Sequence, residues 1–242
     1  DEYTMISFSN LTQQKAIYLA QLQQMQERIE HVTAAEFQRN RVEILAGLMR
    51  LRQICDTPAL FMEDYKGNSG KLDSLRDLLR QIAEGNHRVL IFSQFRGMLD
   101  RIEEELPQLG LTSFKITGST PSQDRQEMTK VFNQGERDVF LISLKAGGVG
   151  LNLTGADTVI LVDLWWNPAV ESQAIGRAHR MGQEQAVEVY RLITRGTIEE
   201  KIQELQEQKK NLVSEVLDGT ESRGSLTLTE IQEILGISQV RT

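Results

Sequence analysis

Between residues 88 and 193 the sequence alternates short apolar runs with amphipathic segments of helical period. Continuous apolar runs of this length are typical of strands that are buried on both faces of a sheet. Strands that alternate with helices predict a mostly parallel sheet covered by helices on both faces, which is an α/β fold. The predicted strands are residues 88–93, 112–117, 138–143, 157–163 and 187–193, and the predicted helices are residues 71–83, 98–109 and 123–132.

Polar or glycine-rich turns follow four of these strands, at residues 93–95, 118–125, 147–150 and 163–166. The carboxyl ends of parallel strands meet at one edge of a sheet, and ligands of open α/β sheets bind beyond that edge. The four turns therefore predict a binding edge.

The turn that follows residues 138–143 contains Gly147, Gly148 and Gly150. Glycine permits a positive φ and a close approach of the backbone to a ligand, and successive N–H groups in such a turn can form an anion-binding nest. A glycine cluster alone is also typical of an ordinary turn. Here the order of strand, glycine turn, strand ending in Asp163 and helix favours a phosphate site.

The next segment predicts a helix that begins at Pro168, with Asn167 as its N-cap. Gln173, Arg177 and Arg180 follow at offsets that share one face of that helix. A guanidinium is a rigid, permanently charged fork, so two of them beside an amide suit a polyphosphate and could act as arginine fingers. A solvated surface face with Arg–Glu pairs is the alternative, and the spacing alone does not separate the two.

Three stretches at this edge resemble motifs V, Va and VI of the Swi/Snf-type DNA translocases of helicase superfamily two. They are Ala146-Gly-Gly-Val-Gly-Leu-Asn-Leu153, Trp166-Asn-Pro168 and Gln173-Ala-Ile-Gly-Arg-Ala-His-Arg-Met-Gly-Gln183. Phe92-Ser-Gln-Phe95, and Ile116-Thr-Gly-Ser-Thr120 with Arg125, resemble the remaining motifs of the same lobe. The resemblance covers nearly the whole chain, and it points to the prokaryotic branch of the family.

The resemblance implies a RecA-like, three-layer α/β/α lobe, the second of two motor lobes in an ATP-dependent translocase on double-stranded DNA. In such a lobe Arg177 and Arg180 would contact the γ-phosphate of ATP across the cleft between the lobes, and Gln173 would order the site. Gly148 and Gly150 would line the nucleotide and couple it to the DNA.

The resemblance also assigns Ser143, Lys145 and Trp166 to contacts with the DNA backbone. Lys145 stands where the family commonly has Arg, and it keeps the positive charge. Trp165 and Trp166 can equally be core aromatic residues, and the sequence leaves both interpretations open.

The sequence contains no P-loop and no Asp-Glu-x-His motif. Ser69-Gly-Lys71 is not a P-loop, because Tyr65 stands in place of its first glycine and Leu72 in place of its Ser or Thr. In the family the first lobe carries these motifs, which bind the phosphates and Mg²⁺. We therefore expect this chain alone to hydrolyse no ATP and to need the N-terminal RecA-like lobe of the same protein.

The pattern divides the chain into three parts. Residues 1–62 predict a helical hairpin, which resembles the protrusion of the family and is a candidate surface for protein partners. Residues 63–196 form the α/β part, which the resemblance identifies as the RecA-like lobe, and residues 197–242 predict C-terminal helices, which by the resemblance brace that lobe. Within the last part, Thr197 is expected to cap a long helix and Thr229 a short terminal one.

The composition excludes several kinds of site. A single cysteine, Cys55, cannot form an intrachain disulfide, and three scattered histidines do not make a metal site. No apolar run approaches the ~20 residues needed to cross a bilayer, and no signal segment stands at the N-terminus. We expect an intracellular protein, in the cytoplasm of a bacterium or archaeon or in the nucleus of a eukaryote.

The net charge of −7 limits the expected affinity for DNA, because phosphate neutralisation supplies most non-specific binding. Two alternatives therefore stay open. One is a non-catalytic interaction module whose residues 1–62 bind a partner, and the Gln-x-x-x-Arg-x-x-Arg spacing argues against it. The other is a lobe of an RNA helicase of the same superfamily, and the long N-terminal helices and Trp166-Asn-Pro168 argue against that.

Overall fold

The computed structural model describes residues 2–7, 13–143, 151–163, 187–215 and 226–237. By their internal contacts the residues form two compact units, the sheet unit (residues 1–6 and 71–193) and the helical unit (residues 7–70 and 194–242). Helices from both ends of the sequence thus belong to one unit. The three-part division drawn from the sequence stays a prediction.

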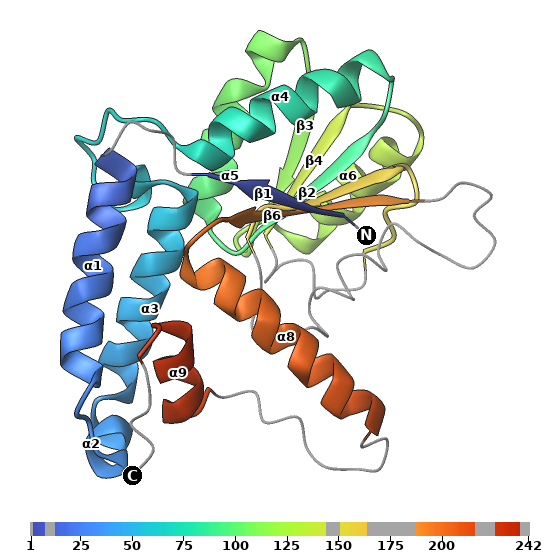
Figure 1. Cartoon of the computed structure of the whole chain (residues 1–242). Coiled ribbons are helices and arrows are strands. Elements are labelled where there is room, and N and C mark those ends of the chain that lie inside the picture. Colours follow the sequence, from blue (N-terminus) through green and yellow to red (C-terminus); the bar gives the residue numbers. More distant parts are fainter. Residues whose placement is uncertain (1, 8–12, 144–150, 164–186, 216–225, 238–242) are drawn as a thin grey trace. The chain divides into compact units, whose positions relative to one another are not determined.

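The sheet unit contains a six-stranded sheet with the strand order β1-β6-β5-β2-β4-β3 (Figure 1). Strands β2 to β6 pair in parallel, with β2 between β4 and β5. Helices lie on both sides of the sheet, so the predicted α/β fold is confirmed. The strands are β1 (Glu2–Ile6), β2 (Val89–Ser93), β3 (Ser113–Ile116), β4 (Val139–Ser143), β5 (Thr158–Leu161) and β6 (Glu188–Thr194).

Three helices of the sheet unit, α4 (Gly70–Glu84), α5 (Arg96–Glu105) and α6 (Ser122–Asn133), confirm the predicted helices with shifted ends. The largest difference is in α5, which was expected to reach residue 109 but ends at Glu105. Pro107 has no N–H to donate to a continuing α-helix. The chain instead forms a short 3₁₀ turn, η2 (Pro107–Leu109), and then reverses at Gly110 with φ of 70°.

The inner strands β2, β4 and β5 are buried at every residue. Phe132 of α6 meets Phe140 of β4 edge to face, with ring centroids 5.1 Å apart, a geometry worth about 0.5–1.5 kcal/mol beyond burial. Each fully buried Leu, Ile or Phe of such a core contributes about 1.5–3 kcal/mol. The sheet is therefore a rigid support whose accessible chemistry lies at the strand ends.

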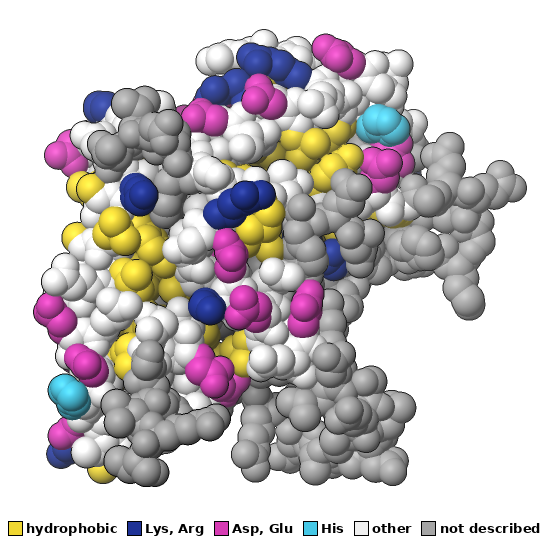
Figure 2. All heavy atoms as spheres, viewed as in Figure 1, with side chains coloured by type: hydrophobic (Ala, Val, Ile, Leu, Met, Phe, Trp, Pro, Cys, Tyr) yellow, Lys and Arg dark blue, Asp and Glu magenta, His cyan; other side chains and the backbone are white. Residues whose placement is uncertain are grey.

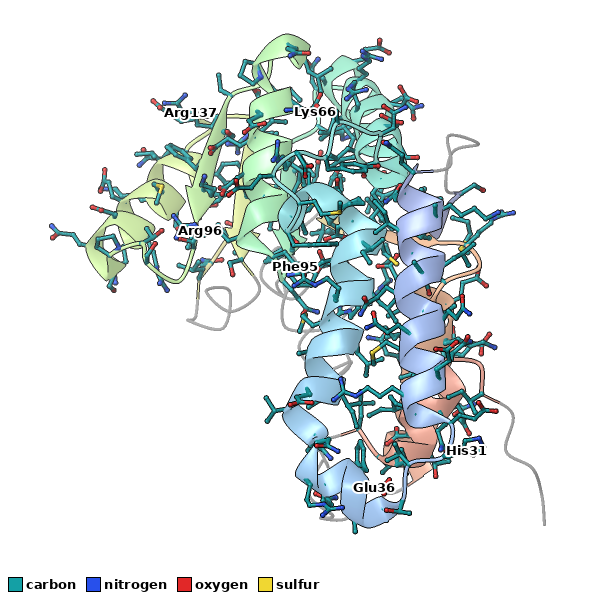
Figure 3. All side chains as sticks on the ribbon, turned by 90° about the vertical axis from the view of Figure 1, so that its left-hand side faces the viewer. His31, Glu36, Lys66, Phe95, Arg96 and Arg137 are labelled. Atoms are coloured by element: carbon teal, nitrogen blue, oxygen red, sulfur yellow. The ribbon has the colours of Figure 1, made fainter. Side chains whose placement is uncertain are left out.

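The helical unit contains α1 (Gln13–Ile29), α2 (Ala34–Arg39), α3 (Arg41–Asp56), the 3₁₀ turn η1 (Pro58–Leu60), α8 (Ile198–Glu215) and α9 (Leu228–Ile234). Helices α1 and α3 pack along each other (Figure 3). Helix α3 ends at Asp56, because Thr57, which precedes Pro58, is extended. None of the described helices combines the length and the apolar character that a membrane span requires.

Two predictions for the ends of the chain are wrong. Glu2–Ile6 is strand β1 rather than part of a helix, because it joins the sheet beside β6, and such a long-range pairing leaves no local signal. Helix α9 is capped by Thr227 rather than Thr229. Thr227 Oγ1 accepts the Glu230 N–H at 3.1 Å and Glu230 Oε1 accepts the Thr227 N–H at 3.0 Å, which is a capping box. The Thr197 cap is confirmed, since its Oγ1 accepts the Glu199 N–H at 3.2 Å.

Two buried polar residues of α1 form hydrogen bonds with backbone groups of other residues of the helical unit. Gln14 donates through Nε2 to the Ile54 carbonyl near the end of α3 at 2.8 Å, and its Oε1 accepts the Gly70 N–H at 3.1 Å. One turn later, the Tyr18 hydroxyl accepts the Ile198 N–H at the start of α8 at 2.9 Å. Helix ends leave backbone groups without intrahelical partners. Burial raises the pKa of the Tyr18 hydroxyl, so it stays protonated at neutral pH.

We expect Tyr18→Phe to lower the free energy of unfolding by about 1–3 kcal/mol, because it leaves the buried Ile198 N–H without this acceptor. Tyr65→Phe is the matched control. The Tyr65 hydroxyl donates to the Asn68 carbonyl in an exposed position, so its loss should cost less than about 1 kcal/mol. Equilibrium urea unfolding measures both variants, and equal losses would contradict the role given to Tyr18.

Candidate functional site

The carboxyl ends of β2, β4 and β5 lie next to one another at one edge of the sheet. Ser93, the last residue of β2, is in register with Ser143, the last residue of β4. On the other side Phe92 is in register with Leu161, and the Val162 N–H donates to the Phe92 carbonyl at 3.0 Å. The strand ends that the sequence assigned to a common edge thus adjoin one another.

Asp163, two residues beyond the end of β5, is 1% exposed. Its Oδ2 accepts a hydrogen bond from Ser93 Oγ at 2.5 Å, and its Oδ1 accepts one from the Gln94 N–H at 2.8 Å. The Phe95 N–H in turn donates to Ser93 Oγ at 3.1 Å. A buried carboxylate is tolerated only with such donors, and here they come from the turn that follows β2.

Lys71, in the first turn of α4, is fully buried, and its Nζ donates to the Val162 carbonyl at 2.7 Å. The neighbouring Ser69 hydroxyl donates to the Asp56 carbonyl within the helical unit. The Ser69-Gly-Lys71 stretch thus leads into helix α4. Lys71 binds a backbone carbonyl within the sheet unit, to which Lys71 itself belongs.

The loop between β3 and α6 is held by the guanidinium of Arg125. Its Nε donates to the Thr120 carbonyl at 2.8 Å, and its Nη2 donates to the carbonyls of Thr117 at 3.1 Å and Gly118 at 3.2 Å. Arg96, labelled near the start of α5 in Figure 3, donates to Ser119 Oγ of the same loop at 3.3 Å. Four hydrogen bonds from two arginines therefore hold residues 117–120.

Among the predicted site residues, Ser143 lies in the described part of the chain, buried at the end of β4 with 6% exposure. Sequence reasoning assigned no role to Lys71 or to the pairing of Ser93 with Asp163. A carboxylate that ends a buried apolar run was the available signal for the latter. The predicted residues that lie outside the described residues are Lys145, Gly148, Gly150, Trp166, Gln173, Arg177 and Arg180.

Within the described ranges, no group of three or more His, Cys, Asp or Glu side chains is placed to hold a metal ion. On the face seen in Figure 2, the described acidic and basic side chains are interspersed. The described residues on that face therefore offer no continuous basic surface to a nucleic acid.

Comparison with known proteins identifies relatives of both units. Residues 70–182 match the helicase conserved C-terminal domain family. A Bacillus subtilis protein named as an ATP-dependent helicase/translocase, YwqA, is 37% identical over 237 residues, which cover 96% of this chain and 26% of that protein. The chromatin-remodeling ATPase INO80 of Aspergillus oryzae is 46% identical over 164 residues, which cover 67% of this chain and 11% of that protein. The chain thus spans only a small part of the length of these relatives.

Solved structures show the same likeness. The Sulfolobus solfataricus SWI2/SNF2 ATPase C-terminal domain matches with a TM-score of 0.75 and 28% identity over 98% of both chains. The Sulfolobus solfataricus SWI2/SNF2 ATPase core in complex with double-stranded DNA matches with a TM-score of 0.77 and 28% identity, over 98% of this chain and 50% of that chain.

We expect Arg125→Lys to loosen the loop after β3, because one ammonium cannot hold three carbonyls as a guanidinium fork does. Amide hydrogen exchange at Thr117 and Thr120 should become at least about tenfold faster, while exchange in β4 stays unchanged. Arg96→Lys is the control, since Arg96 reaches the same loop through one longer hydrogen bond. Equal exchange rates in wild type and Arg125→Lys would contradict the role of Arg125.

Proposed function

Since this chain belongs to the Swi/Snf-type helicases and carries their conserved C-terminal domain, we propose that it is the second motor lobe of an ATP-dependent translocase on double-stranded DNA. The likeness to a separately solved SWI2/SNF2 C-terminal domain over nearly all of both chains carries the proposal. The related ATPase core bound to double-stranded DNA supports duplex DNA as the substrate. The moving lobe would remodel protein–DNA complexes.

In this proposal ATP binds between this lobe and a first lobe that carries the P-loop. Arg177 and Arg180 stabilise the negative charge on the γ-phosphate, and Gln173 orders the site. The helical spacing of these three residues supports side chains that point to the same side of one helix. Gly148 and Gly150 line the nucleotide with backbone N–H groups. Mg²⁺ is held mainly by the first lobe.

The DNA contacts in the proposal come from the same edge of the sheet. Lys145 follows Ser143 by two residues at the end of β4, and a cation there suits a phosphate of the DNA backbone. Trp166 follows the end of β5 and would pack against the duplex. The Ser143 side chain is largely buried, so we expect it to contribute less than Lys145.

The turns proposed for nucleotide and for DNA leave the same rigid sheet, which supports coupling between them. Closure of the two lobes on ATP and reopening after hydrolysis would advance the protein along the duplex. This chain supplies one side of the cleft, so in the proposal it hydrolyses no ATP by itself.

A second candidate function is a non-catalytic interaction module. The net charge of −7 favours it, because a nucleic-acid-binding domain more often carries a basic excess. Either function would act in the cytoplasm of a bacterium or archaeon or in a eukaryotic nucleus, where DNA is present.

Arg180→Ala in the protein that carries both lobes should reduce ATP turnover about 10³-fold or more, as loss of an arginine finger does. Its affinity for duplex DNA should change less than about twofold, because the finger contacts the nucleotide. Arg195→Ala, which removes an exposed arginine outside the motif, is the control. An unchanged turnover rate in Arg180→Ala would sink the finger assignment.

ATP turnover by the two-lobed protein should rise about tenfold or more with duplex DNA and much less with RNA, because only the preferred nucleic acid stabilises the active state. This chain alone should show no turnover with either. Equal stimulation by RNA would favour an RNA helicase, and no turnover in the two-lobed protein would favour the interaction module.

A further inference from the structure

At the amino edge of the sheet, one carboxylate joins the start of β2 to the start of β5. Asp157 Oδ1 accepts the Arg88 N–H at 3.2 Å and the Thr158 hydroxyl at 3.0 Å. Asp157 Oδ2 lies 2.8 Å from His87 Nδ1. We call His87, Arg88, Asp157 and Thr158 the amino-edge cluster. Through it, the turn between α4 and β2 is bound to the residue that precedes β5.

The imidazole of His87 lies against the turn that precedes it. Asn86 in that turn has a left-handed backbone, with φ of 55°. A Cβ atom at Gly85 would lie 2.6 Å from His87 Cδ2 and 2.9 Å from His87 Nε2, which is closer than non-bonded atoms approach. The lack of a side chain at Gly85 therefore leaves the space from which the imidazole reaches Asp157.

We propose that the amino-edge cluster is a pH-sensitive switch, in which protonated His87 holds the turn between α4 and β2 on Asp157 and neutral His87 holds it less tightly. Histidine is the side chain whose ordinary pKa, about 6.5, falls within the physiological range. A hydrogen bond between a charged donor and a carboxylate is roughly twice as strong as one between neutral groups. The inference does not depend on the proposed function.

The charges around His87, among the residues that the structure describes, favour its protonated form. The hydrogen bond to Asp157 and the charge of Asp157 raise the pKa of His87, and the charge of Glu188 at the start of β6 adds to this. Glu84 at the end of α4 is also acidic and exposed. The guanidinium of Arg88 instead donates to three backbone carbonyls of neighbouring turns, at 2.7–3.1 Å.

The raised pKa fixes the direction of the pH dependence. A group whose pKa is higher in the folded protein stabilises the fold fully below its ordinary pKa, and this contribution is lost as the pH rises through the raised value. The turn should therefore be held more tightly at about pH 5.5 than at about pH 8.5. The side chains of His87 and Asp157 are 47% and 29% exposed, so solvent screening keeps the effect modest.

Amide hydrogen exchange of this chain tests the switch, because the Arg88 N–H is bound by Asp157. After correction for the intrinsic exchange rate at each pH, we expect the protection factor of the Arg88 amide to fall about threefold between about pH 5.5 and about pH 8.5. In His87→Gln, whose amide donates but gains no proton, protection should not change with pH. His31→Gln is the matched control and should keep the wild-type fall, because His31 is exposed and lies 3.9 Å from its neighbour Glu30.

Gly85→Ala tests the geometry without removing a titrating group. The backbone at Gly85 is not left-handed, so alanine is tolerated there, and its methyl group should move the imidazole away from Asp157. NMR titration of the His87 ring should then give a lower pKa than in wild type.

Three results would overturn the proposal. They are a wild-type Arg88 protection factor that does not change with pH, an equally large fall in folded His87→Gln, and an unchanged pKa of His87 in folded Gly85→Ala. If Gly85→Ala fails to fold, His87→Gln decides.

Discussion

Complete burial of β2, β4 and β5 is the constraint on which the rest of the sheet unit depends. A polar side chain inside these strands would lose water and gain no partner, so polar chemistry is confined to the strand ends. At the carboxyl edge Asp163 is tolerated because Ser93 and Gln94 donate to it. The same burial therefore leaves the adjoining ends of β2, β4 and β5 as the places in these strands where polar groups lie.

The helical unit depends on a different interaction, the pairing of helix ends with polar side chains of α1. Gln14 and Tyr18 lie one turn apart and bind backbone groups from Ile54, Gly70 and Ile198. An apolar stripe on α1 accounts for its packing on α3. A stripe alone does not determine where the end of α3 and the start of α8 lie along α1. The hydrogen bonds of Gln14 and Tyr18 fix these positions within the helical unit.

Local patterns predicted most of the described elements of the sheet unit, because burial on both faces leaves continuous apolar runs and burial on one face leaves a helical period. The same patterns failed at β1, where Glu2–Ile6 is a strand only because an edge of the sheet is available to it. They also misplaced the cap of α9 by two residues, since both Thr227 and Thr229 suit a cap and only the reciprocal bond with Glu230 distinguishes them.

The sequence by itself determined the fold class and the family, because apolar runs and motifs are each contained within a short stretch. The roles of the glycine turn and of Gln173, Arg177 and Arg180 stay predictions. Only the tertiary structure decided that Ser93 meets Asp163 across 70 positions and that Lys71 meets Val162 across 91. Such pairs depend on strand order and register. Those follow from the packing of the whole sheet, and no local period records them.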